Sequence, residues 1–209
     1  MFRIRAHALG RIMTEPKNKG EVLSVGAKTY VEELAKEFVY GYRKTVNTKE
    51  MDKGIICEGQ SIDLLNEVLF SNLTKNTERR ENDWLSGECD IFTPSRIHDI
   101  KSSWSLATFP ATVHAAKDRE YEWQGRAYMM LWDVDAFEVD YCLVSTPDEL
   151  IRFEDPALHY VDHIDPSLRV TRVPYTRDKG LEELIKQKVD AARDYFENTV
   201  QRIAEEHAA

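Results

Sequence analysis

Asp99 and Lys101 lie two positions apart in residues 96 to 103, a segment in which polar and apolar residues alternate. Side chains of an extended strand alternate between its two faces, so the acid and the amine project from one face while Ile100 points to the other. Asp90 precedes this segment and reaches the same face if the two strands pair in the right register. Adjacent carboxylates repel each other unless a cation lies between them, and Mg²⁺ binds such sparse carboxylate sites. For an Asp-x-Lys triplet alone, a surface salt bridge is the alternative.

Glu58 lies on the apolar stripe of a predicted helix, residues 54 to 70, together with Ile55, Ile62 and Leu65. A charge buried on such a stripe is costly unless it is paired, so the carboxylate needs a partner. That partner is a metal ion with its bound water, or a cation in a buried ion pair. The acids predicted on the neighbouring strands favour the metal.

Gln124 and Tyr128 are one helical turn apart in residues 112 to 132, which have helical spacing. An amide on a largely apolar face needs hydrogen-bond partners, which a carboxylate, an active-site water or a DNA phosphate would supply. A glutamine at the margin of the core is the alternative.

The elements that must position these residues follow from the spacing of the apolar side chains. A period of 3.6 residues indicates helices, and strict alternation indicates strands. Thr93-Pro94-Ser95 predicts a hairpin turn, and helices before and after a small central sheet predict a mixed α/β fold. We expect helices at 25–43, 54–70, 112–132 and 179–206, strands at 87–92, 96–103, 137–145 and 169–175, and loops at 14–20 and 146–168.

The chain length of 209 residues and the hydrophobic content of 42% fit one domain with a full-sized core. We therefore predict a single domain over residues 1–209. Its three cysteines, Cys57, Cys89 and Cys142, build neither a disulfide framework nor a four-thiolate metal site. No apolar stretch is long enough to span a bilayer or to act as a secretory signal, which predicts a cytoplasmic protein with no membrane partner.

The net charge of -9 is unevenly distributed. Residues 1 to 53 contain 11 Lys and Arg against 7 Asp and Glu, so this quarter of the chain is locally basic. Binding to phosphates is driven by Lys and Arg, which makes this quarter the better candidate for contact with nucleic acid. A solvated helical face explains the same charges equally well.

Four local patterns follow one another along the chain. They are Gly54-x-x-x-Glu58, Gly87-x-x-Asp90, Asp99-Ile100-Lys101-Ser102 followed by Trp104 and Phe109, and Gln124-x-x-x-Tyr128. In this order the chain resembles the PD-(D/E)XK nuclease superfamily, and more narrowly the lambda exonuclease-like phage recombination nucleases. The resemblance covers residues 50 to 146 and implies a restriction-endonuclease-like core, a small central mixed β-sheet flanked by helices, with the helix at 179–206 following it.

The resemblance implies a Mg²⁺-dependent exonuclease, with Mn²⁺ as a substitute, that degrades linear double-stranded DNA from its ends in the 5′→3′ direction. Such enzymes leave single-stranded tails for phage-type recombination and work with a single-strand annealing protein, in the host cytoplasm for a phage-encoded enzyme. Related nucleases form rings around DNA, so we expect a homo-oligomer, such as a trimer. The implied metal ligands are Asp90, Asp99, the Ile100 carbonyl and Glu58, and the implied catalytic residues are Lys101, Glu58 and Gln124.

The segment 2–13 resembles the region in which the family binds the DNA 5′-phosphate with an Arg and a Ser. His7 stands at the position of the Ser, and the position of the Arg precedes residue 1. We therefore name Arg5 and Arg11 as candidate DNA contacts, with Gln124 and Tyr128 added from the predicted helix. Ordinary surface arginines are the alternative for the first two.

Two rival functions remain open from the sequence. The first keeps the chemistry, as an endonuclease or a single-strand nuclease, and comparison of linear, circular and 5′-dephosphorylated DNA distinguishes these from an exonuclease. The second is a non-catalytic DNA-binding or interaction protein that keeps the fold, which failure to bind Mg²⁺ or Mn²⁺ would favour.

Overall fold

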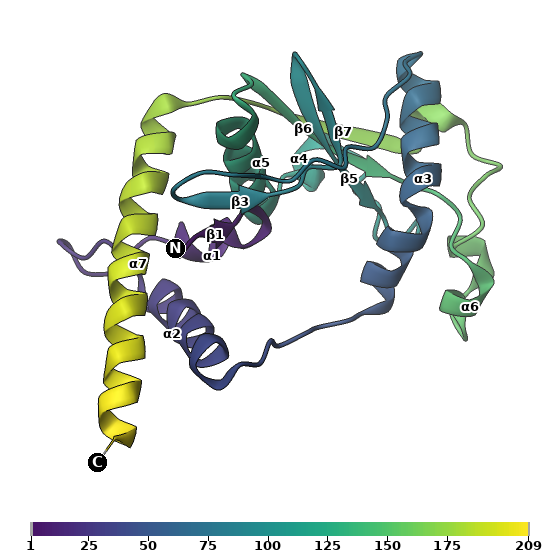
Figure 1. Ribbon diagram of the computed structural model, residues 1–209. Helices are drawn as coiled ribbons and strands as arrows, with labels where there is room; N and C mark the ends of the chain where they lie inside the picture. The colour runs from purple at the N-terminus through teal and green to yellow at the C-terminus, as the bar shows by residue number, and fades with distance from the viewer. Residues whose placement is uncertain (1, 209) are drawn as a thin grey trace.

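The computed structural model describes residues 2–208 and contains two β-sheets with helices packed around them (Figure 1). The central sheet has the strand order β4-β5-β6-β7. β4 is antiparallel to β5, β5 is parallel to β6, and β6 is antiparallel to β7, so the sheet is mixed. The predicted mixed α/β fold is confirmed. The central strands are β4 (Ile91–Thr93), β5 (Arg96–Ser102), β6 (Ala136–Cys142) and β7 (Val170–Thr176).

A second sheet, which the sequence analysis did not predict, joins the N-terminal segment to the middle of the chain. Its strands are β1 (Ile4–Arg5), β2 (Arg80–Glu81) and β3 (Leu85–Gly87), in the order β1-β3-β2. Strands of two or three residues are too short to show an alternating pattern.

Helices cover both faces of the central sheet. On one face, Ile100 and Cys142 pack against α3, and on the other, Phe137 and Val139 belong to the core shared with α5. The long C-terminal helix α7 lies beside α2 at the other end of the molecule (Figure 1). The helices are α1 (Leu9–Ile12), α2 (Val25–Tyr40), α3 (Lys49–Leu69), α4 (Val113–Ala116), α5 (Arg119–Trp132), α6 (Asp148–Ile151) and α7 (Lys179–His207), with short 3-10 turns at Ala6–Ala8, Pro156–Leu158 and Pro166–Leu168.

Two helix boundaries differ from the prediction for reasons of capping. α3 begins at Lys49 rather than at residue 54, because the Thr48 side chain accepts a hydrogen bond from the Met51 N–H and caps the helix there. The single helix predicted at 112–132 is two helices, because Asp118 adopts an extended backbone and caps α5 instead of continuing α4.

The predicted strand 87–92 is wrong over its first half. Gly87 ends β3 in the other sheet, and residues 88 to 90 belong to no strand. The backbone of these residues bonds elsewhere: the Asn76 N–H donates to the Asp90 carbonyl at 2.7 Å, and the Tyr128 hydroxyl donates to the Glu88 carbonyl at 2.9 Å. Only Ile91–Thr93 pairs with β5, through the predicted turn.

Gly125 sets the distance between α5 and the central sheet. A Cβ atom at this position would overlap the ring of Phe137, which is fully buried on β6. Only glycine lets the two backbones approach this closely. The adjacent Gln124 is thereby brought against β5.

Candidate active site

A cavity of about 730 Å³ lies where α3, the end of β5 and α5 meet. The sequence analysis placed four side chains and one backbone carbonyl around a shared cation, and the residues concerned all line this cavity. They are Glu58, Asp90, Asp99, Ile100 and Lys101, and Gln124 lines it as well.

Asp99 and Lys101 lie side by side on β5. The Asp99 Oδ2 is 2.6 Å from the Lys101 Nζ, and the Asp99 side chain is only 1% exposed. Burial alone would lower the pKa of Lys101, but the carboxylates of Asp99 and Asp90 outweigh it and raise the pKa above its usual value. The two carboxylates therefore favour the ammonium form of Lys101 in the protein alone.

The ring of Tyr121, which the sequence analysis did not single out as a site residue, holds the ammonium from the other side. The Lys101 Nζ lies 4.4 Å from the centre of this ring, within the range of a cation–π interaction. Tyr121 is three residues before Gln124, so both project from the same side of α5 toward the cavity. That spacing was the signal in the sequence that could have identified it.

Gln124 and Tyr128 form a polar layer beneath Asp99. The Gln124 Nε2 donates to the Asp99 Oδ1 at 3.0 Å and lies 3.0 Å from the Tyr128 hydroxyl. Tyr128 is 4% exposed, and its hydroxyl donates to the Glu88 carbonyl. The expected DNA contact of Tyr128 does not fit this burial; its side chain instead positions Gln124. Gln124 orients Asp99 through one half of its amide and still borders the cavity.

Asp90 lies one residue before β4, at the edge of β5 that β4 leaves unpaired. Its Oδ2 accepts a hydrogen bond from the Ile100 N–H at 2.6 Å. In an extended strand the N–H and the carbonyl of one residue project to the same side, so the Ile100 carbonyl faces the same edge as Asp90. Burial and the neighbouring Asp99 raise the pKa of Asp90 to about 7.

This raised pKa predicts a pH-dependent stability for the metal-free protein. An unfolded aspartate has a pKa of about 3.9, so the folded state binds the Asp90 proton more tightly. We expect the free energy of unfolding, measured in chelator, to fall as the pH rises from 4 to 7, because over this range the unfolded state releases a proton that the folded state still holds on Asp90. In Asp90→Asn, which keeps an oxygen for the Ile100 N–H, this fall should be smaller. Parallel pH profiles for the two proteins would contradict the assignment.

Glu58 reaches the cavity from α3 and is paired with Lys75. Its side chain is 22% exposed, so it is half-buried rather than buried. The predicted apolar stripe is wrong at Ile55, which is 75% exposed at the cavity, whereas Ile62 and Leu65 are buried as expected. Lys75 follows the helix by only a few residues and was not recognised, because it lies in a loop without a periodic pattern.

The donor set fits a divalent cation. Among the residues described, the buried Asp99 Oδ2 has no hydrogen bond of acceptable geometry, although Lys101 is close. Asp90 and Glu58 add two further carboxylates, and all three acids line one cavity. Hard oxygen donors with room for water are the environment that Mg²⁺ and Mn²⁺ prefer.

Lys53 is a third residue that the sequence analysis missed, after Tyr121 and Lys75. It is fully buried on α3, and its Nζ donates to the carbonyls of Ser103, Trp104 and Val144 at 2.7, 3.0 and 2.8 Å. Burial lowers the pKa of Lys53 to about 8, so it remains charged at neutral pH. The ammonium thus joins the helix that carries Glu58 to the ends of β5 and β6. Its place four residues before the buried Cys57, on the same side of the helix, was the available signal.

The N-terminal candidates lie beside the active-site cavity rather than in it. Arg5, His7 and Arg11 line an adjacent cavity of about 530 Å³, which shares Met51 with the first. Arg11 is paired with Glu33 at 3.1 Å. His7 is close enough to the active site that Lys101, after burial, contributes to lowering its pKa.

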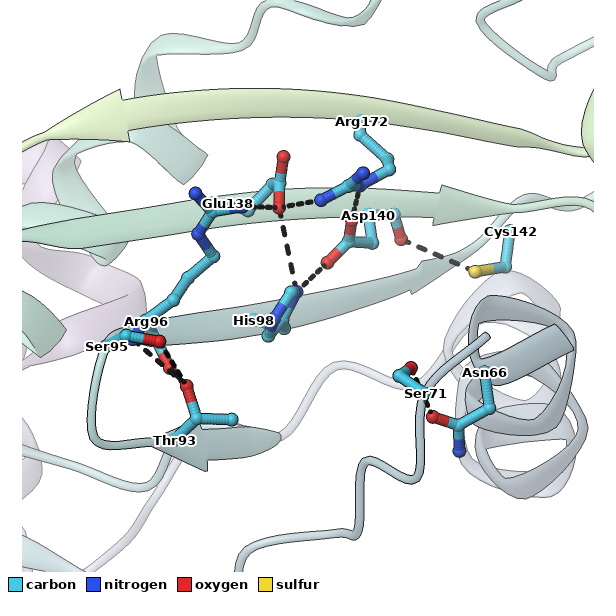
Figure 2. A network of polar contacts seen from close by, with 10 residues as sticks. All are labelled: Asn66, Ser71, Thr93, Ser95, Arg96, His98, Glu138, Asp140, Cys142 and Arg172. Carbon is cyan, nitrogen blue, oxygen red and sulfur yellow. Dashed lines mark hydrogen bonds and ion pairs between the residues drawn. The ribbon is translucent and has the colours of Figure 1, made fainter. Parts of the chain in front are cut away.

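A different cluster, shown in Figure 2, lies on the opposite face of the central sheet. His98, Glu138 and Asp140 place three possible metal-ligand atoms within 4.8 Å of one another. The Glu138 Oε2 already accepts hydrogen bonds from Arg96 and Arg172, at 2.8 and 2.5 Å, and the Asp140 Oδ2 is paired with the His98 Nδ1 at 2.7 Å (Figure 2). Because two guanidinium groups already balance the two carboxylates, this cluster suits a cation less well than the cavity does.

Comparison with known proteins identifies the family. The chain matches the crystal structure of a phage-related exonuclease from Haemophilus somnus 129PT with a TM-score of 0.91 and 34% sequence identity, over 97% of this chain and 96% of that chain. The chain is a lambda exonuclease-like nuclease. An alkaline exonuclease from Laribacter hongkongensis, LHK-Exo, has the same fold, with a TM-score of 0.73 and 15% identity over 99% of this chain and 93% of that chain. No protein-family model and no curated protein matches the sequence.

The suspected membership in this PD-(D/E)XK family is therefore confirmed, and the protein is a nuclease. For a lambda exonuclease-like nuclease, the roles of the individual site residues stay predictions, now supported by their convergence on one cavity. Among the helices of residues 2–208, none combines the length and the apolar character needed to cross a bilayer.

Proposed function

We propose that this nuclease is a metal-dependent DNA exonuclease that hydrolyses phosphodiester bonds at the ends of linear double-stranded DNA. The single observation that supports it best is the arrangement of Asp99 and Lys101, 2.6 Å apart on one face of β5, in a cavity that Asp90 and Glu58 also line. Three carboxylates can hold a metal ion that binds the phosphate of the substrate, and the ammonium group can balance the charge of that phosphate.

Asp90, Asp99, the Ile100 carbonyl and Glu58 would hold Mg²⁺, with Mn²⁺ as a substitute. When bound, the ion lowers the pKa of a water molecule and neutralises charge on the scissile phosphate. In the protein without metal, the pKa of Asp90 is raised and Glu58 is paired with Lys75. Metal binding therefore requires Asp90 to lose its proton and Glu58 to turn from Lys75. Both changes bring further oxygen donors to the cavity.

Lys101 acts on the phosphate as a fixed cation. The ammonium is held between the Asp99 carboxylate and the Tyr121 ring, so its position is set before substrate arrives. A pre-positioned charge of this kind stabilises negative charge that develops in the transition state. Gln124 fixes the orientation of Asp99 and orients water or the DNA backbone at the wall of the cavity.

The family resemblance supports the direction of degradation, the role in recombination and the partners that we propose. The protein would degrade DNA in the 5′→3′ direction and leave single-stranded tails for phage-type recombination. It would act with a single-strand annealing protein, as a homo-oligomer such as a trimeric ring. Arg5 and Arg11, which line the adjacent cavity, would contact the DNA there, and Arg11 would first have to release Glu33. Because all these contacts go to phosphate, little base specificity is expected.

An end-labelled linear duplex tests the proposal. We expect Mg²⁺ to support loss of the label from the 5′ end, chelator to stop it, and covalently closed circular DNA to resist. Degradation of the circle would indicate an endonuclease, and loss of a 3′ label first would reverse the direction. No degradation of any DNA with either Mg²⁺ or Mn²⁺ would overturn the proposal.

A further inference from the structure

The active-site cavity adjoins the cavity of about 530 Å³ at Met51, the lining residue that the two have in common. A third cavity, of about 550 Å³, lies next to the second. The second and third cavities share five lining residues, so they form one groove. These shared residues are Arg5, Tyr30, Leu34, Glu37 and Arg43.

The groove is basic in a chain that is acidic overall. Five cationic side chains, counting only Lys and Arg, line it against three carboxylates: Arg3, Arg5, Arg11, Arg43 and Lys44, against Glu33, Glu37 and Glu197. Arg3 and Arg11 are paired with Glu81 and Glu33. Within residues 2–208, Arg5 and Arg43 have no ion-pair partner, and Arg5 is half-buried. Unpaired guanidinium groups in a groove favour an anionic ligand.

Exposed aromatic rings alternate with these charges. Phe38 is 68% exposed at the end of α2, and Tyr42 is 49% exposed just beyond it. Both line the third cavity with Arg43. Tyr42 and Arg43 belong to the extended linker, residues 42–48, that crosses from α2 to α3 (Figure 1). A positively charged groove with aromatic rings along it is the arrangement that proteins use for single-stranded nucleic acid, since rings stack on bases and cations bind phosphates.

We propose that this groove binds single-stranded DNA that continues from the active-site cavity, with Arg5 and Arg43 on its phosphates and Tyr42 and Phe38 on its bases. The proposal rests on the proposed function only in that the same strand enters the active site. Paired DNA fits less well, because the bases of a duplex are stacked on each other and offer no free faces to Tyr42 and Phe38.

Binding of a fluorescein-labelled oligothymidylate, measured by anisotropy in chelator, tests the groove without any cleavage. We expect Tyr42→Ala to weaken binding about 5- to 100-fold, the loss of one stacked base, and Tyr42→Phe to bind like the wild type. Arg43→Ala should lower the salt dependence, the slope of log K against log salt, by about 0.7. Lys179→Ala, which removes an exposed charge at the start of α7, is the matched control and should change neither quantity.

Unchanged affinity and slope for oligothymidylate in both Tyr42→Ala and Arg43→Ala would overturn the proposal, and so would tighter binding of oligouridylate. The variants alter exposed residues, and equal melting temperatures will show that they fold. The proposed function fails separately, through absence of Mg²⁺-dependent degradation. A Lys101→Ala protein that binds the oligothymidylate normally but does not cut DNA would support both.

Discussion

Lys101→Ala is expected to fold as the wild type does and to lose Mg²⁺-dependent DNA degradation by a factor of about 10² to 10³. The ammonium is the one fixed positive charge between Asp99 and Tyr121, and alanine supplies nothing in its place. Asp99→Asn should lose at least as much, because it removes a metal ligand while an amide of the same shape preserves the packing. Initial rates on a linear duplex, at saturating Mg²⁺, measure both losses.

The controls separate chemistry from folding. Lys186→Ala removes a lysine that is paired with Glu183 on α7, away from the cavity, and should leave the rate unchanged. Mg²⁺ should raise the melting temperature of the wild type but not that of Asp99→Asn, since only a protein that binds the ion is stabilised by it. Retained activity in Lys101→Ala or Asp99→Asn would refute the site.

Gly125→Ala is expected to lower the free energy of unfolding by about 2 kcal/mol or more, as overpacking of a dense core does. The new methyl group would overlap the buried Phe137 ring, and α5 would have to move away from β6. That movement would also draw Gln124 from Asp99, so activity should fall with stability. Chemical denaturation and the nuclease assay measure the two effects.

A matched pair of variants isolates the steric cause. Gly59→Ala changes a glycine on α3 that has nothing within 4 Å of the added atom, and it should stabilise the protein by about 0.5 to 1 kcal/mol, as alanine does in helices. Phe137→Leu should recover part of the loss when it is combined with Gly125→Ala, because it removes the ring carbons that clash. Additive effects of the two substitutions would rule out this contact as the cause.

The side chains on regular elements were predictable from the sequence. Asp99 and Lys101 share a face because β5 is a seven-residue strand, and a period of two leaves no other arrangement. The helical turn from Gln124 to Tyr128 follows in the same way from α5. In both cases the local geometry of the backbone alone determines which side chains lie together.

The contacts that depend on tertiary packing were not predictable. Asp90 lies outside any strand, since its backbone bonds to Asn76, and only the fold brings its carboxylate to Ile100. The partner of Glu58 comes from a loop, and the carbonyls that bind Lys53 come from two separate strand ends. No periodicity connects such residues, because they are distant in sequence or lie in irregular segments.

The brevity of β4 has a consequence for access to the scissile bond. With three residues against the seven of β5, β4 pairs only as far as His98, so the ladder stops one residue before Asp99. A longer β4 would have formed hydrogen bonds with the N–H and carbonyl of Ile100 and would have covered the carboxylates beside them. An open sheet edge is ordinarily a site of aggregation. Here the short outer strand β4 leaves such an edge open beside the active-site carboxylates, so a nucleotide chain can reach them from this side.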